Sequence, residues 1–388
     1  MGKWTRCGLV LTLTLLLPGC WDRTEVNDIG FILSSAIDLE KDGSIRYSVL
    51  LPLPGQMGGA TGGGGGTSGG MSYYIDSEVG RTFREAQSKL QERMPRRMFL
   101  AHRRTILVGE ALAKDSIRFI FDAIPRSPES RMTTYFIVAE GKAYELLQST
   151  PKFERFPSEA IRELAKSKVV VDMNMKDFAL ALSTTGADPV AVFMGVRESE
   201  KGLKNSKEIQ ILGYSQFKGD RMIGTLQGDE AFGLGLLKGR SVHIPVTVTM
   251  EDRHLSFRIY DSQCQIKPKI QNGKLSYEID VETQAKVVES SGYYDFSQQD
   301  KINAAEERVE AFIKKSIESA IKKMIDNEAD SAQFGNYIWR AYPNAWKQRY
   351  RPEWPGALKQ AEFVINVDAI LAESGLIYNN VTATETHR

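Results

Sequence analysis

The residues with the clearest chemical role lie near the start of the chain, where Cys20 closes the sequence Leu17-Pro18-Gly19-Cys20. A branched apolar residue, two further residues and a cysteine form the lipobox that bacterial lipoprotein processing recognises. The expected chemistry is transfer of a diacylglycerol to the Cys20 thiol, cleavage before that residue, and acylation of the new amino terminus. Two or more acyl chains, at about 0.8 kcal/mol per buried methylene, give stable anchoring. We therefore predict a lipid anchor at Cys20.

Residues 1–19 have the layout of a signal peptide. Lys3 and Arg6 supply its positive start, and the leucine-rich run that follows is too short to cross a bilayer, which needs about 20 apolar residues. The end of the run lacks the small residues of an ordinary A-x-A-like cleavage site. We therefore expect removal as a lipoprotein signal, rather than as a plain secretory signal followed by an incidental cysteine.

No other pattern in the sequence predicts catalysis or metal binding. The neighbouring carboxylates Asp229 and Glu230 would point to opposite faces of a strand. The glycines lack the spacing of nucleotide-binding loops, and there is no Gly-x-Ser-x-Gly elbow. We predict a non-enzymatic protein without cofactor or metal; a peptidoglycan-active enzyme would need a suitably placed pair of carboxylates. None of the histidines is spaced as a metal-binding pair: His102, His243, His254 and His387.

Cysteine count and charge exclude further classes of site and partner. Cys7 lies in the signal and Cys20 takes the lipid, so Cys264 remains alone and no intramolecular disulfide is expected. Cys264 is interpreted as a small buried hydrophobe. The chain has 50 Lys and Arg against 49 Asp and Glu. This neutral balance argues against nucleic acid as a partner.

The first half of the mature chain mixes strand and helix patterns, which predicts an N-terminal α+β domain over residues 20–200. A glycine-rich stretch at residues 52–70 is expected to be a flexible surface loop, because glycines have no side chain to bury. An amphipathic helix is predicted at residues 77–94, with Ser77 as its N-cap. Further elements are expected as a hairpin over 27–51, a strand at 105–109, a helix at 110–124 and a strand at 133–139.

Residues 205–388 predict a second α+β domain, with a division near residue 240 as an alternative. Strands of period two recur between residues 209 and 288, as in a sheet with one wet face. An amphipathic helix at residues 297–325, about 40 Å long, is expected to pack across that sheet. The predicted fold class is α+β, with two or three tandem mixed domains, largely antiparallel sheets and a long C-terminal amphipathic helix.

Aromatic residues cluster in the last part of the chain and have two interpretations. Aromatic residues spaced four positions apart can pack as core against the sheet, and we favour this interpretation. The alternative is an interface, where aromatic residues with a polar group are enriched. The cluster comprises Tyr337, Trp339, Tyr342, Trp346, Tyr350 and Trp354.

The segment from Gly19 to Asp28, GCWDRTEVND, resembles the start of the Ger(x)C spore germination lipoproteins. Other segments resemble the family in the same order, so the resemblance covers the chain from Cys20 to about Asn379. These segments are His102-Arg103-Arg104-Thr105-Ile106-Leu107-Val108-Gly109-Glu110, Pro128-Glu129-Ser130-Arg131, Phe217-Lys218-Gly219-Asp220 and Tyr342-Pro343.

The resemblance implies a non-enzymatic third subunit of a nutrient germinant receptor, lipid-anchored at the outer face of the spore's inner membrane. Its implied partners are two integral-membrane subunits, one transporter-like and one larger with a cytoplasmic region, together with the membrane lipid. Lipid tethering raises the local concentration, so that a weak interface suffices. The candidates for contact with a partner are the residues nearest the anchor: Trp21, Asp22, Arg23, Glu25 and Asp28. The alternative is that these residues form only a solvated tether.

A second function remains open from the residues alone. A lipid-anchored solute-binding protein would capture germinant and deliver it to a membrane transporter. Such proteins usually alternate strand and helix into parallel sheets in two lobes, whereas the strands here are predicted to be antiparallel.

Overall fold

The computed structural model describes residue 2 and residues 25–53, 72–199, 206–239, 245–250, 252–291 and 294–373. The predictions for Cys20, for Trp21, Asp22 and Arg23, and for residues 54–70 of the glycine-rich loop lie outside the described residues.

The N-terminal half of the described chain forms an eight-stranded sheet in the order β10-β9-β8-β7-β6-β2-β3-β4. Its four central strands, β8, β7, β6 and β2, are parallel, and the flanking pairs are antiparallel. The strands are β2 (Ser34–Leu39), β3 (Ile45–Pro52), β4 (Tyr73–Gly80), β6 (Thr105–Gly109), β7 (Tyr135–Ala139), β8 (Val190–Glu198), β9 (Lys207–Lys218) and β10 (Arg221–Leu226).

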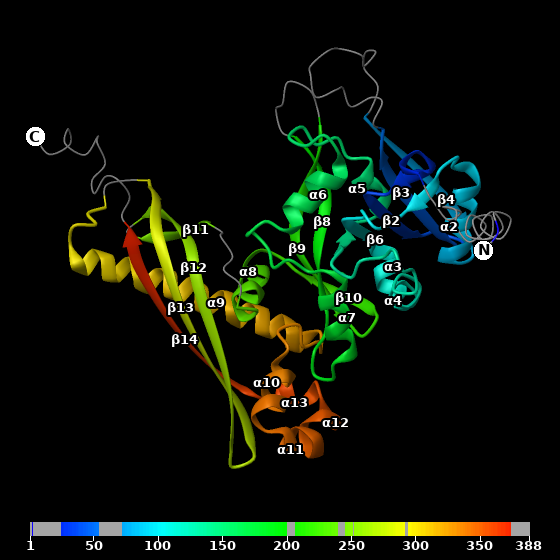
Figure 1. Ribbon diagram of the computed structural model, residues 1–388. Coiled ribbons are helices and arrows are strands. Elements are labelled where there is room, and N and C mark those ends of the chain that lie inside the picture. The colour runs from blue at the N-terminus through cyan, green and yellow to red at the C-terminus, as the bar shows by residue number, and fades with distance from the viewer. Residues whose placement is uncertain are drawn as a thin grey trace, which may run out of the picture.

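Helices cover both faces of this N-terminal sheet (Figure 1). Successive residues of β6 alternate between the two layers, since Ile106 and Val108 pack in one core and Leu107 packs in the other. This double burial explains the apolar run Ile106-Leu107-Val108 in β6. One layer contains α2 (Phe83–Arg93), α3 (Glu110–Asp115), α4 (Arg118–Ala123) and α7 (Met175–Ser183), and the other α5 (Ala143–Leu147) and α6 (Pro157–Ala165).

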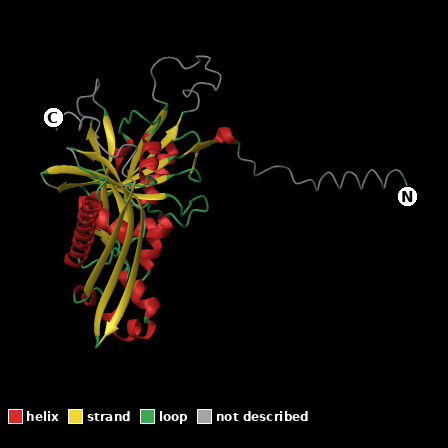
Figure 2. Cartoon of the chain, turned by 90° about the vertical axis from the view of Figure 1, so that its left-hand side faces the viewer, coloured by secondary structure: helices red, strands yellow, loops and turns green. Residues whose placement is uncertain are grey.

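The C-terminal sheet has four strands in the order β11-β12-β13-β14, with β13 and β14 parallel. Helix α9 (Gln299–Asp326) packs on one face through Ala305, Val309, Ile313 and Ile317, and the opposite face is polar. Figure 2 shows the long strands of this sheet at the bottom of the molecule. The strands are β11 (Pro245–Met250), β12 (Arg253–Gln271), β13 (Lys274–Ser290) and β14 (Glu362–Glu373).

Helix α9 also protects the outer edge of β14. Glu310 accepts a hydrogen bond from the Ala369 N–H at 3.1 Å, and Glu306 accepts one from the Leu371 N–H at 2.8 Å. Short helices precede β14: α10 (Phe334–Ala341), α11 (Pro343–Ala345), the π-helix η3 (Trp346–Tyr350), α12 (Arg351–Glu353) and α13 (Gly356–Lys359).

Helix α8 (Gly228–Leu237) connects the two sheets by packing backbone to backbone on α9. A Cβ on Gly233 would lie 2.2 Å from the Ser316 carbonyl oxygen. Hydrogen bonds add to this connection, because the Gln216 amide donates to Ser331 Oγ at 3.0 Å and accepts from Asn327 at 2.7 Å. The two sheets are therefore held together by packed helices and buried polar contacts.

The predicted α+β class, with largely antiparallel sheets and a long C-terminal helix, is confirmed. The parallel centre of the N-terminal sheet is a difference, because parallel strands were expected only of solute-binding proteins. Strands β9 and β10 continue this sheet beyond residues 200–205, where we predicted the division into domains; that division stays a proposal. The helix predicted at residues 110–124 is two helices, because Asp220 binds the intervening turn through Ser116 Oγ at 2.6 Å and the Ile117 N–H at 3.0 Å.

The predicted N-cap at Ser77 is wrong. Ser77 lies inside β4, which pairs with β3, and the helix begins six residues later at Phe83. The Thr82 hydroxyl caps it by accepting from the Glu85 N–H at 3.1 Å. Strand pairing across the sheet thus overrode the apparent helical spacing of Val79 and Phe83.

Candidate functional site

The described chain after the predicted anchor begins with Glu25 and the short 3-10 helix η1 (Val26–Asp28). The Asp28 N–H donates to the Glu25 carbonyl at 3.0 Å, and the Glu25 N–H donates to the Asp28 carboxylate at 3.3 Å. Val26 between them is 69% exposed. The structure therefore brings Glu25 and Asp28 together as the ends of one turn that presents an apolar side chain.

This turn forms one side of a hollow of about 700 Å³, which we call the anchor-side hollow. Strand β1 (Ile29–Phe31), which pairs with β5 (Arg97–Phe99), continues the wall. The end of β3 and the turn after α2 complete it. The lining is mainly apolar, and its apolar side chains include Val26, Ile29, Leu51, Leu53, Met94 and Pro95.

Charged and aromatic groups stand around the hollow. Arg93 is held by Asp76 at 2.6 Å and Glu78 at 2.9 Å. Arg96 is exposed, and its guanidinium forms no ion pair within the part of the chain that the structure describes. Tyr74 is 48% exposed. An apolar hollow with a free cation and a phenol nearby is suited to contact an apolar segment of another molecule.

The sequence contained little signal for this hollow. Its walls come from residues 26–31, 51–53, 74 and 93–96, which only the fold brings together. The only local indication of the hollow was the apolar residue Val26 beside the charged residue Glu25.

The remaining singled-out residues have structural surroundings. Burial raises the pKa of the Cys264 thiol to about 12, so this half-buried group is protonated and unreactive at neutral pH. His102 packs edge-on to Phe31, with ring centroids 5.1 Å apart. The described residues contain no group of three His, Cys, Asp or Glu that could hold a metal ion.

Two expectations from the C-terminal half have different outcomes. Trp346 and Tyr350 are buried, as the core interpretation predicted, whereas Trp339 is 52% exposed. The expectation that Asp229 and Glu230 lie on a strand is wrong, because both belong to the first turn of α8. The segment packs as a helix on α9.

No helix in the described ranges is long and apolar enough to cross a membrane.

Comparison with known proteins identifies the family. Residues 22–196 match the family described as "Spore germination protein N-terminal domain", and residues 213–375 match "Spore germination B3/ GerAC like, C-terminal". The chain is 32% identical to the putative spore germination protein YfkR of Bacillus subtilis, over 97% of this chain and 98% of that one. It is 26% identical to spore germination protein KC of the same organism, over 92% and 94%.

A solved structure shares the fold. The crystal structure of the GerBC protein superimposes with a TM-score of 0.58 at 17% identity, covering 87% of this chain and 96% of that one. Together with the matches over both halves of the sequence, this confirms the resemblance seen in the GCWDRTEVND segment. The chain belongs to the Ger(x)C family of spore germination proteins.

Proposed function

We propose that this protein is a lipid-anchored, non-catalytic subunit of a spore nutrient germinant receptor, required for the response to germinants and the start of germination. It is held by Cys20 at the outer face of the spore inner membrane, beside two integral-membrane subunits. Family membership supports the germination role. The observation that carries the subunit role is the anchor-side hollow, because its wall begins only a few residues after the predicted lipid site in the sequence.

Covalent geometry places the hollow near the membrane once Cys20 is anchored. Glu25 lies five residues after Cys20, and an extended chain spans at most about 3.3–3.6 Å per residue, or about 17 Å here. Val26 is therefore held close to the membrane surface, where membrane-embedded subunits emerge from the bilayer. An apolar segment of such a subunit is the occupant that the hollow fits.

The energetics favour a weak contact strengthened by the tether. Each 100 Å² of apolar surface that such a segment covers contributes about 2.5 kcal/mol. Anchoring both proteins in one membrane makes the second contact effectively intramolecular, so a small interface suffices. The exposed Arg96 would pair with an acidic group beside the incoming segment.

The non-catalytic role is supported by the chemistry of the described side chains. The free thiol of Cys264 is protonated, and on the first turn of α8 Asp229 is exposed and Glu230 is half-buried. Binding and positioning of partners is what this arrangement favours.

The first test addresses the anchor. Intact mass of membrane-extracted wild-type protein should include diacylglycerol on Cys20, and Cys20→Ala should lose both the lipid and the nutrient response of spores. Unlipidated wild type, or normal germination of the mutant spores, would sink the anchored role. A double substitution of Asp22 and Arg23 to alanine tests whether the segment at the anchor contributes beyond the lipid.

The second test addresses the hollow. Met94→Glu places a charge in the apolar wall, so we expect at least about a tenfold loss of co-purification with the membrane subunits, or 1.4 kcal/mol. The matched control is Phe153→Glu, since Phe153 is 99% exposed and lies outside the hollow. Equal recovery of partners with both variants would exclude the hollow as the contact.

A further inference from the structure

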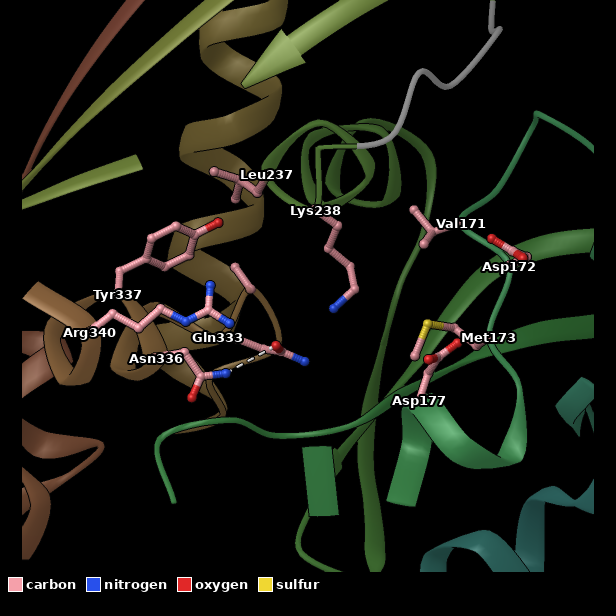
Figure 3. Close-up of a pocket in the computed structure, with 11 residues that line it drawn as sticks. Val171, Asp172, Met173, Asp177, Leu237, Lys238, Gln333, Asn336, Tyr337 and Arg340 are labelled. Carbon is pink, nitrogen blue, oxygen red and sulfur yellow. Dashed lines mark hydrogen bonds between the residues drawn. The ribbon is translucent and has the colours of Figure 1, made fainter. Parts of the chain in front are cut away.

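A polar cleft lies between the two halves of the molecule (Figure 3). Residues 171–177, which lead into and begin α7, form one wall, and the end of α8 with α10 forms the other. Its volume is about 240 Å³. That is below the roughly 300–1,000 Å³ of sites for drug-sized ligands, so the cleft is suited to a smaller molecule.

The two walls carry opposite charges. Lys238 and Arg340 stand on the C-terminal wall, and Asp172 and Asp177 stand on the N-terminal wall. Figure 3 shows the Lys238 ammonium group extending into the space between Arg340 and Asp177. Among the described residues, neither the Arg340 guanidinium nor the Asp177 carboxylate forms a hydrogen bond or ion pair. A cation and a carboxylate therefore face a shared space without meeting.

Fixed elements hold these groups apart. The buried Asp330 carboxylate accepts hydrogen bonds from the Phe334 and Gly335 N–H groups, both at 2.8 Å, which fixes the start of α10. On the other wall, the Val171 N–H donates to the buried Tyr214 hydroxyl at 2.7 Å. Lys238 is oriented by a hydrogen bond of 3.1 Å from its Nζ to the Ser331 carbonyl. The cleft is thus preformed.

The cleft also holds an unpartnered polar atom. Asn336 lines it, and the Asn336 Oδ1 is buried with no hydrogen-bond partner. This oxygen is enclosed within the wall, and the Asn336 amide nitrogen donates to the Gln333 side-chain oxygen at 3.2 Å, so the two side chains shape the cleft. Apolar contact is available from Leu237 and Met173 on the two walls.

We propose that the polar cleft binds a small zwitterion of α-amino-acid type, with its carboxylate at Arg340 and Lys238 and its ammonium group at Asp177. A guanidinium can hold a carboxylate through two parallel hydrogen bonds, and charge-assisted bonds of this kind are the strong ones. The ligand bridges the N-terminal and C-terminal halves. This site stands independently of the lipid anchor and of the anchor-side hollow.

The test is calorimetry on the full-length, detergent-solubilised protein with a panel of free α-amino acids. Ligands up to about 10 mM reveal dissociation constants in the millimolar range. We expect at least one amino acid to bind, and we expect its N-acetyl and amide derivatives to bind at least about tenfold more weakly, because each lacks one of the two charges. Absence of binding by every amino acid would overturn the proposal.

Variants locate the binding. Asp177→Asn and Arg340→Gln should each weaken binding by about tenfold or more, equivalent to 1.4 kcal/mol. The matched controls are Lys176→Gln on the same helix and Arg351→Gln, both exposed and outside the cleft. Equal weakening in the controls would place the ligand elsewhere. Undiminished binding of the N-acetyl derivative would show a simple anion site, which also contradicts the zwitterion.

A direct ion pair is the competing explanation for the facing charges. If the walls closed so that Asp177 met Arg340, both variants would lower the thermal unfolding temperature equally and no amino acid would bind. That combination would replace the ligand with a closure of the two halves.

Discussion

Asp188 and Asp330, which lie 142 positions apart, join the two halves through reciprocal backbone contacts. The Asp330 N–H donates to the Asp188 carboxylate at 2.7 Å, and the Asp188 N–H donates to the Asp330 carbonyl at 2.9 Å. Asp188 precedes β8 of the N-terminal sheet, and Asp330 follows α9. The link therefore connects the larger sheet to the helix that covers the smaller one.

Replacing Asp330 should loosen this junction. Its carboxylate accepts two backbone N–H groups at the start of α10, whereas an asparagine offers only one acceptor oxygen. We expect Asp330→Asn to lower the free energy of unfolding by about 1–3 kcal/mol at pH 8, measured by urea denaturation. Asp326→Asn, an exposed change at the end of α9, is the control and should have little effect.

The same residue should give the protein a pH-dependent stability. Burial raises the pKa of the Asp330 carboxyl to about 7. Because the folded chain binds this proton more tightly than the unfolded chain, the contribution to stability is full below about pH 4 and is lost as the pH rises to about 7. Asparagine does not titrate, so the stability difference between wild type and Asp330→Asn should narrow from pH 5 to pH 8, by at most about 1.4 kcal/mol per pH unit. If the unfolding free energies of the two proteins changed in parallel with pH, the raised pKa would be contradicted.

The close approach of α8 and α9 should not tolerate a side chain at Gly233. An added Cβ would lie 2.2 Å from the Ser316 oxygen and 2.5 Å from its carbon, both backbone atoms. Gly233→Ala should therefore cost about 1–3 kcal/mol in thermal or urea unfolding. In Gly356→Ala the added atom meets nothing within 4 Å, and this helical control should be neutral or stabilising. A neutral Gly233→Ala would mean that the helices separate freely.

The glutamates that cover β14 should limit self-association. Glu306→Ala with Glu310→Ala removes the acceptors for the Leu371 and Ala369 N–H groups and leaves the strand edge unpaired. Exposed strand edges pair with other chains. The double variant should form larger species in sedimentation velocity, whereas Glu307→Ala with Lys314→Ala, exposed on the same helix, should match wild type.

Local patterns in the sequence predicted much of the secondary structure. β6 and α9 were found because a short apolar run and a long three-and-four spacing are each typical of one kind of element. The end of β4 and the start of α2 were misassigned, although Thr82 with Glu85 carries the capping signal. The parallel pairing of β6 with β2 and β7 depends on strands far apart in sequence, which no local pattern encodes.

The candidate sites divide in the same way. The lipidation predicted at Cys20 rests on four consecutive residues and stays a prediction. The anchor-side hollow and the polar cleft each collect side chains from several distant segments. Asp177 and Arg340, for example, are unremarkable helix residues until the packing of α8 and α9 sets them across one space.

If the proposed anchor holds the protein at a membrane, the protected edge of β14 has a further consequence. Molecules anchored in one leaflet diffuse in two dimensions and meet their neighbours repeatedly in similar orientations. Such encounters favour pairing between exposed strand edges. The carboxylates of Glu306 and Glu310 occupy two backbone N–H groups on the outer edge of β14, so another strand cannot pair there. Under the proposed anchoring, each copy would thereby stay a separate unit at high surface density, with its other faces available for different neighbours.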